Sequence, residues 1–388
     1  MKNLSCVLIL VILGFSCAEK KSANTVHFDS NFAGARLDSV SNSGNETYVA
    51  YISPAFEPVN KSPYYAFSIS SEIEKTIEVQ LNYGAYKHRY IPKLSMDKSS
   101  WKKIDAKNIK LDTIKGTATL KLDVSKQKLY VSAQEIETSK DTYAWVDRLV
   151  AKHSNLKKVV GGKTANGNNN YCMELENSKI KRAVVLIARQ HPPETPGGTI
   201  GFKAFYEALL SNSDDAEAFR NNFNLYAFPL LNPDGADMGH WRHNANGKDL
   251  NRDWIEFTQP ETKMVKTYLE KKVLEGQSIA FGIDFHTSYS GPYLLILDSI
   301  NESKTKGIIP KWVENIEKHS DFEVETRRRS QELPYCYNYI YNQFGAEAVT
   351  YEEGDEIHRT LVKKRARVYA NQLMKTLLKN NETHALQN

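Results

Sequence analysis

The chain has 388 residues, of which 41% are hydrophobic and 25% are charged. This composition excludes a globally disordered chain, and the length suits two domains better than one. The net charge of +5 comes from basic residues scattered along the chain, so we expect no nucleic-acid partner.

The N-terminal segment has the pattern of a signal peptide. Lys2 precedes an apolar run over residues 4–15 that is too short to span a bilayer, and a small residue precedes Cys17. The stretch 13–17 resembles a bacterial lipoprotein processing site, in which the cysteine is lipidated. We predict a signal peptide over residues 1–16 and a lipidated tether over 17–25. Such a lipid would hold an exported protein at a membrane of the cell envelope, in the periplasm or outer membrane. The alternative is a freely soluble secreted protein.

Two cysteines remain after the signal peptide and the lipidation site are set aside. Cys172 and Cys336 lie in a chain expected in an oxidising compartment. A disulfide between them and two buried free thiols both fit the sequence.

Residues 26–137 have the period-two pattern of β-strands. Apolar and polar side chains alternate over residues 65–69, 77–81 and 120–124. Short strands separated by turn residues predict an antiparallel β-sandwich domain. The segment carries no catalytic constellation, so its aromatic residues are interpreted as core.

Residues 138–380 alternate between strand and helix patterns. A helix is expected over 141–156, and a loop rich in glycine and asparagine over 161–170. Strands are then expected near 183–187, 225–231, 279–285, 293–297 and 346–351, and helices near 202–209, 260–274, 310–318, 335–342 and 357–378. This order predicts an α/β domain with a mainly parallel mixed sheet and helices on both faces, followed by a tail over 381–388.

Three side chains at predicted strand ends suit a metal site. His191 and Glu194 share one turn after the strand 183–187, and His286 ends a second strand. Two imidazoles and one carboxylate form a catalytic zinc site that leaves a fourth position open. The His-x-x-Glu spacing alone is weak, because ten histidines produce such a match by chance.

Further polar residues follow other predicted strands. Arg242 and Arg252 are suited to carboxylate recognition and to stabilising a developing oxyanion. Asp249 is suited to accept a proton from a zinc-bound histidine. Glu352 ends a strand, where a carboxylate can act as a general base.

Along the chain, the order of these motifs resembles that of the zinc carboxypeptidases related to carboxypeptidase A. The resemblance implies that His191, Glu194 and His286 bind one Zn²⁺ per chain, and that Arg242 polarises the scissile carbonyl. It implies that Asn251 and Arg252 hold the terminal carboxylate of the substrate. Glu352 would be general base and acid, in preference to Glu353, because Thr-Tyr-Glu is similar to the family's Thr-Phe-Glu.

A closer resemblance is to the cytosolic-carboxypeptidase branch and its bacterial relatives, which place a β-sandwich before the peptidase domain. Asn232-Pro233-Asp234-Gly235 and the spacing from Arg242 to Arg252 carry this resemblance. The family's substrate-capping tyrosine has three candidates, which are Tyr289, Tyr335 and Tyr337.

We therefore expect a membrane-anchored zinc exopeptidase that acts on peptides with a free C-terminal carboxylate. Within the same superfamily, a cell-wall peptidase that cuts γ-D-glutamyl-diaminopimelate bonds and a small-molecule amidohydrolase are alternatives. An inactive, zinc-free binding protein is the alternative from another class. The sequence leaves open the preferred side chain, the oligomeric state and the role of the β-sandwich.

Overall fold

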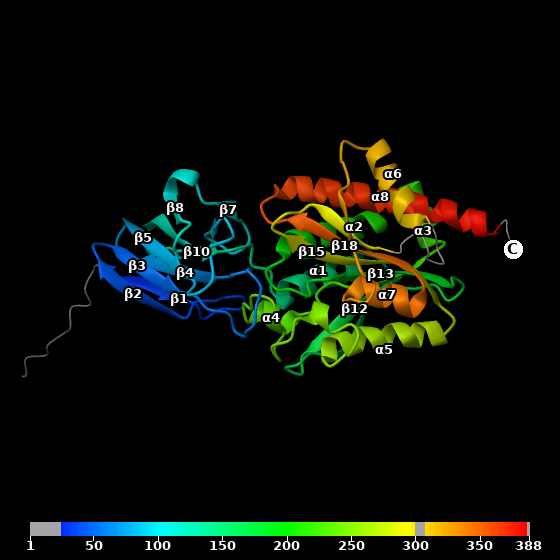
Figure 1. Ribbon diagram of the computed structural model, residues 1–388, viewed down its shortest axis with the longest axis horizontal. Helices are drawn as coiled ribbons and strands as arrows, with labels where there is room; N and C mark the ends of the chain where they lie inside the picture. Colours follow the sequence, from blue (N-terminus) through cyan, green and yellow to red (C-terminus); the bar gives the residue numbers. More distant parts are fainter. Residues whose placement is uncertain (1–24, 299–306, 386–388) are drawn as a thin grey trace, which may run out of the picture.

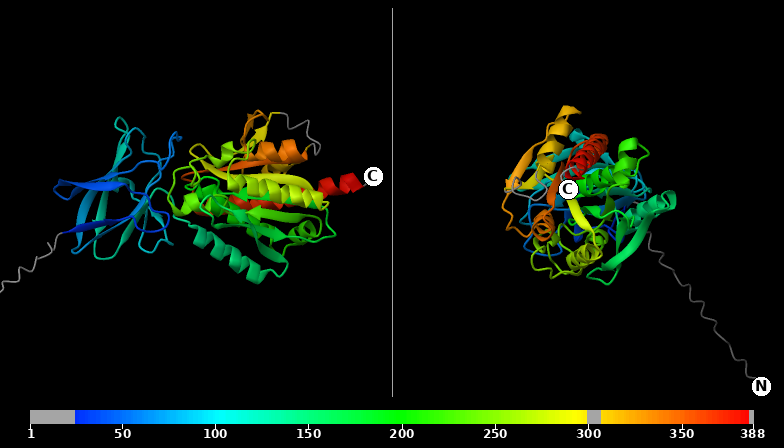
Figure 2. Two further views of the ribbon diagram at one scale, coloured as in Figure 1. Left: turned by 90° about the horizontal axis from the view of Figure 1, so that it is seen from below. Right: turned by 90° about the vertical axis from the view of Figure 1, so that its right-hand side faces the viewer.

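The structure is a computed structural model that describes residues 25–298 and 307–385. A β-domain and an α/β domain lie end to end, as two perpendicular views show (Figure 1, Figure 2). The predicted signal peptide and Cys17 lie outside the described residues. Within the described residues, no helix is long and apolar enough to cross a membrane.

The β-domain consists of two five-stranded sheets packed around one core. The first sheet has the order β1 (Val26–Asp29), β4 (Ala66–Ser71), β10 (Leu129–Ser132), β6 (Lys93–Ser95) and β7 (Lys102–Lys103). The second has the order β2 (Ser39–Gly44), β3 (Thr47–Tyr51), β5 (Lys75–Asn82), β9 (Thr117–Val124) and β8 (Ile109–Asp112), with the short helix η1 (Ala106–Asn108) before β8. The predicted sandwich is confirmed, although β3 and β5 run parallel.

The α/β domain is built on an eight-stranded mixed sheet. Its order is β11 (Leu156–Lys163), β12 (Asn169–Leu175), β14 (Asn224–Phe228), β13 (Arg182–Ala188), β15 (Ser278–Ser288), β18 (Glu347–Gly354), β16 (Tyr293–Leu297) and β17 (Thr326–Arg329). The four central strands, β14, β13, β15 and β18, are mutually parallel. Because both faces of these strands are covered, they are nearly continuous apolar runs.

Helices cover both faces of this sheet, as predicted. One face packs against α1 (Ser139–Lys152), α2 (Phe202–Leu209), α3 (Asp214–Arg220), α6 (Ile308–Lys318) and α8 (Arg359–Ala385). The other packs against α5 (Pro260–Leu274) and α7 (Cys336–Phe344). In Figure 1, α6 and α8 lie above the sheet, and α5 and α7 lie below it.

The structure corrects the loop predicted over residues 161–170. These residues belong to a hairpin, in which β11 pairs with β12 through Lys163 and Asn169. Gly161 and Gly162 are part of β11, where a Cβ atom would come within 2.9 Å of Met264 in α5. The glycines therefore mark a close approach of a helix to a strand, where the sequence pattern indicated a loop.

Other boundaries differ in smaller ways. The strands β11, β12 and β17 and the helix α3 were not predicted, and α8 continues to Ala385, beyond the predicted end near residue 378. Cys172 and Cys336 are both buried free thiols, which decides between the two alternatives for this pair.

Candidate metal centre

The predicted metal ligands meet at the carboxyl ends of two neighbouring parallel strands, and a third strand beside them carries Glu352. His191 and Glu194 follow β13, and His286 lies near the end of β15. On β18, Glu352 pairs directly with His286. Open α/β sheets place their sites at this edge.

A glycine allows the turn that carries Glu194 to approach β15. The turn continues into a short π-helical segment, η2 (Pro196–Gly201). A Cβ atom on Gly197 would lie 1.7 Å from the carbonyl oxygen of His286, and the Gly197 N–H donates to Thr287 Oγ1 at 2.8 Å. A larger residue here would push the Glu194 turn away from His286.

The imidazole nitrogens point inward as a metal site requires. Nδ1 of His191 and Nδ1 of His286 are 3.2 Å apart, and each lies 2.8 Å from a Glu194 oxygen. The outward Nε2 atoms lie 2.9 Å from Asp249 and 2.7 Å from Asp284. Because each carboxylate accepts a hydrogen bond from an Nε2–H group, the Nδ1 lone pairs are left facing one another and Glu194. Two facing lone pairs beside a carboxylate fit a cation, and the donor set fits zinc with an open position.

The charges of these groups agree with this assignment. Burial raises the pKa of Glu194, but His191 and His286 outweigh it and hold that pKa well below its ordinary value. Glu194 is therefore ionised. Burial opposes a charged His286, but Asp284 and Glu194 raise its pKa well above the ordinary value. A proton therefore competes with the metal at His286.

Of the two carboxylates behind the histidines, only Asp249 was predicted. Asp284 and His286 are two residues apart on β15, so their side chains share one face of the strand. This spacing is the signal that could have identified Asp284. Gln190 donates to Asp284 at 2.7 Å, and the Trp254 indole N–H donates to Gln190 at 2.9 Å.

The guanidinium of Arg242 lies against the metal centre. Its Nε donates to Asp249 Oδ2 at 2.6 Å, and its Nη1 is 3.9 Å from Glu194 Oε1. Burial disfavours the charge, but Asp249 and Glu194 raise the pKa of Arg242. A fixed positive charge therefore stands beside the ligands.

Asn251 and Arg252 have separate environments. Asn251 is buried: its Oδ1 accepts from the Cys336 N–H at 3.0 Å, and its Nδ2 is 3.4 Å from His286 Nε2. Arg252 is exposed, and its guanidinium lies 4.6 Å from the centre of the Tyr335 ring. Of the other two tyrosine candidates, Tyr337 is fully buried and Tyr289 is 77% exposed.

Two adjacent glutamates on β18 face different surroundings. Glu353 is fully buried, and both its oxygens accept from Arg365, at 2.7 and 2.6 Å. Glu352 lies on the metal side, and its Oε2 has no hydrogen-bond partner among the described residues. Burial raises the pKa of Glu352 to about 8, with His286 acting in the opposite direction. Glu352 therefore places beside the centre a carboxyl group that gains or loses a proton near neutral pH.

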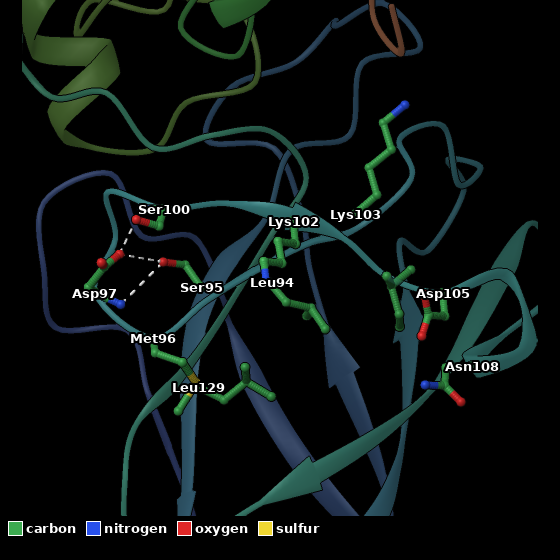
Figure 3. A pocket seen from close by; sticks show the side chains of 11 residues that line it. Leu94, Ser95, Met96, Asp97, Ser100, Lys102, Lys103, Asp105, Asn108 and Leu129 are labelled. Carbon is green, nitrogen blue, oxygen red and sulfur yellow. Dashed lines mark hydrogen bonds between the residues drawn. The ribbon is translucent and has the colours of Figure 1, made fainter. Parts of the chain in front are cut away.

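The β-domain has a separate pocket of about 490 Å³ (Figure 3). Leu94, Met96 and Leu129 contribute its apolar wall. The Asp97 carboxylate accepts hydrogen bonds from the Ser95 hydroxyl and the Ser100 N–H. Its lining includes no residue of the metal centre.

The site agrees with comparisons to known proteins. The family model of the zinc carboxypeptidases matches residues 142–385. Human cytosolic carboxypeptidase 2 is 34% identical over 129 residues, which are 31% of this chain and 14% of that protein. Mouse cytosolic carboxypeptidase 3 is 32% identical over 139 residues, which are 34% of this chain and 14% of that protein. The matched segments thus span only a small part of these curated relatives.

Solved structures share the fold of both domains. A metallo-carboxypeptidase from Burkholderia cenocepacia superimposes with a TM-score of 0.76 at 20% identity, covering 93% of this chain and all 100% of that chain. A metallo-carboxypeptidase from Pseudomonas aeruginosa gives a TM-score of 0.73 at 16% identity, covering 92% of this chain and 99% of that one. With the family match over 142–385 and the His191–Glu194–His286 ligand set, the chain belongs to the zinc carboxypeptidase family.

Proposed function

We propose that this protein is an exported zinc carboxypeptidase that hydrolyses the last peptide bond of substrates with a free C-terminal carboxylate. The observation that carries the proposal is that two functional groups adjoin the His191–Glu194–His286 centre: Glu352 pairs in register with His286, and the Arg242 guanidinium lies 3.9 Å from Glu194. A base, an oxyanion donor and a metal site then converge on one point.

Zinc held by these three ligands supplies a Lewis acid that activates water and polarises a carbonyl. The residues of the chain supply the proton transfers. Glu352 takes a proton from the attacking water and delivers it to the nitrogen of the leaving residue. Arg242 donates to the carbonyl oxygen as negative charge develops there, and Asp249 keeps the guanidinium oriented.

Selection for the chain end is assigned to Arg252 and Asn251. Arg252 is exposed and stacks on Tyr335, so its remaining donors can reach a carboxylate that enters from solvent. Asn251 is already bonded to Cys336 and lies against His286, so its part is to hold the loop that presents Arg252. The contact with Arg252 favours Tyr335 as the tyrosine that closes over the substrate.

Three measurements test the proposal. Purified protein should contain about one zinc per chain and should hydrolyse N-acylated dipeptides with free C-termini. Glu352→Gln should lower kcat by at least about 10²-fold, which is typical of a lost general base. Zinc-free protein, or a fully active Glu352→Gln variant, would overturn the mechanism. If L-alanyl-γ-D-glutamyl-diaminopimelate is cleaved faster than every dipeptide, the substrate class is cell-wall peptides.

The cellular location is also a proposal. It rests on the lipoprotein-like sequence around Cys17 and on the place of β1, which starts at the end of the β-domain far from the catalytic domain (Figure 1, Figure 2). An extended tether over residues 18–25 reaches at most about 28 Å. A lipid on Cys17 would therefore keep the β-domain near the membrane and the metal centre away from it. Cys17→Ser should move the protein from the membrane to the soluble fraction, and an unchanged distribution would contradict the anchor.

A further inference from the structure

The β-domain contacts the catalytic α/β domain at several places, and two of these contacts lie in the segments that carry Arg242 and Glu352. These are the loop around Trp241 and the turn that follows β18. The contacts are made by charged and aromatic side chains that come from several parts of the β-domain.

The first contact is a set of ion pairs at the end of β18. Arg89 of the β-domain donates from Nε to Asp355 Oδ2 at 2.8 Å and from Nη2 to Oδ1 at 3.0 Å. Glu356 accepts from Lys93 at 2.7 Å and pairs with Lys103 at 3.0 Å. Asp355 is only 4% exposed, so its partner is fixed in a water-poor interface.

Arg89 compensates for negative charge that would otherwise oppose this turn. Burial and the nearby Glu194 raise the pKa of Asp355, while Arg89 lowers it. A buried carboxylate without its cation is strongly unfavourable. Loss of Arg89 would therefore move the turn or leave Asp355 protonated.

The second contact surrounds Trp241, which directly precedes Arg242. Trp241 is 1% exposed and belongs to the hydrophobic core of the β-domain. The Tyr86 ring packs edge-on against Trp241, with the ring centroids 5.0 Å apart. The Phe56 ring packs against His240, which precedes Trp241, and against His243, which follows Arg242. The backbone next to Arg242 is thus fixed by the other domain.

The Glu352 backbone pairs with His286 of β15 and with Tyr293 of β16, and its side chain is the less constrained part. Its Oε2 has no partner among the described residues, so hydrogen bonds do not hold that oxygen in place. The pairing of β18 with β15 ends at Gly354, one residue before Asp355. Beyond that point, the Asp355 N–H donates to Ser288 at 3.1 Å and the Asp355 carbonyl accepts from Arg359 of α8 at 3.0 Å, while the Asp355 carboxylate is held by Arg89 of the β-domain.

We propose that the β-domain positions the two groups that act on the substrate: Arg89 fixes Glu352 through Asp355, and the β-domain core fixes Arg242 through Trp241. Arg89 and Trp241 are positioning residues, since neither is placed at the reacting atoms. The proposal rests on the proposed function, because it concerns the roles assigned to Glu352 and Arg242.

The test uses the full chain, zinc-loaded, with the N-acylated dipeptide that the wild-type protein hydrolyses fastest. Arg89→Met should lower kcat at least about tenfold and change KM less than about twofold, because a small displacement of a catalytic group lowers the rate of the chemical step. Arg89→Lys keeps the charge but loses the bidentate hydrogen bonding to Asp355, so its kcat should lie between those of Arg89→Met and wild type. Combining Arg89→Met with Asp355→Asn should lower kcat no further than the more severe single variant.

The Trp241 contact is tested in the same way. Trp241→Leu should lower kcat at least about tenfold, and Trp241→Phe, which keeps an aromatic ring against Tyr86, should recover most of it. Lys128→Met removes an exposed ion pair with Asp29 inside the β-domain and should leave kcat unchanged. All variants are compared at equal zinc content and after unfolded protein has been removed.

The outcomes separate the two proposals. A wild-type kcat in folded, zinc-loaded Arg89→Met and Trp241→Leu would overturn the positioning role while leaving the proposed function intact. Unchanged activity of Glu352→Gln, or no hydrolysis by the wild-type protein, would overturn both. If the variants have a lower melting temperature but an unchanged kcat, the contacts serve stability alone, and the positioning role is overturned.

Discussion

The carboxylate of Asp284 lies 2.7 Å from Nε2 of His286, two residues further along the same strand. Asp284 is fully buried and also accepts from Gln190. It therefore fixes the ring orientation of His286 and directs Nδ1 toward Glu194. Since carboxylates of this kind also increase the basicity of the ligand, Asp284 should contribute directly to metal affinity.

Asp284→Ala should weaken zinc binding about 10–100-fold, the usual effect of removing such a partner. Competition with a chromophoric chelator measures the affinity. Asp147→Ala, which removes an exposed ion pair with Lys158, is the matched control and should bind zinc like the wild type. Equal affinity of the Asp284 variant and the control would show that the strand alone orients His286.

Removal of the metal should destabilise the folded protein. A ligand at about 100 times its Kd stabilises the native state by about 2.7 kcal/mol, so dialysis against a chelator should lower the melting temperature. Readdition of zinc should restore it. Glu194→Ala lacks one ligand, so its melting temperature should respond much less to zinc; an equal response would place the stabilising ion elsewhere.

The buried pair of Glu353 and Arg365 should carry a large share of the local stability. Arg365→Met leaves a fully buried carboxylate whose one remaining donor among the described residues is the Tyr351 hydroxyl, at 2.7 Å. We expect a loss of about 3–5 kcal/mol in the free energy of unfolding, measured by denaturant titration. The double variant Arg365→Met/Glu353→Gln should recover part of this loss. A loss below about 1 kcal/mol in the single variant would mean that the site relaxes around the charge.

Stability should fall in mild acid because of His88. Burial lowers the pKa of this imidazole to about 4 from its ordinary 6.5, while Glu356 opposes the shift. The unfolded chain therefore binds a proton that the folded chain does not, and stability is lost as the pH falls from about 6.5 to about 4. The full effect is about 3 kcal/mol at 1.36 kcal/mol per pH unit. His88→Gln cannot titrate, so its unfolding free energy should decline less over this interval than that of the wild type; parallel curves would contradict the assignment.

Peptides without a free C-terminal carboxylate should be hydrolysed slowly. An amidated dipeptide leaves Arg252 without its anionic partner, so kcat/KM should drop at least about tenfold relative to the free acid. Arg252→Gln should reduce that ratio by slowing hydrolysis of the free acid and sparing the amide. Equal rates for acid and amide in the wild-type protein would remove Arg252 from chain-end recognition.

Local patterns were sufficient to predict much of the fold, whereas the metal ligands were assigned from the resemblance of several ordered motifs to the zinc carboxypeptidases. His191 and Glu194 follow one apolar strand and His286 lies near the end of another, and parallel strands bring their carboxyl ends to one edge. The alternation in residues 26–137 similarly predicted the β-sandwich. These features depend on neighbours within a few residues.

Features that arise from contacts between distant segments were missed. Gly161 and Gly162 look like loop residues because the approach of Met264 is not visible in the sequence. The contact between Asn251 and the start of α7 joins residues 85 positions apart. Trp241 has the same limitation, since no local pattern places it in the core of another domain.

The position of Trp241 also has a thermodynamic consequence. When one domain supplies a buried side chain to the other's hydrophobic core, neither can unfold without exposing apolar surface in both. Heat or denaturant should then produce one transition for the 388-residue chain, with fluorescence and circular dichroism midpoints that coincide. The β-domain and the catalytic domain are therefore distinct in structure, but we expect them to unfold together as one cooperative unit.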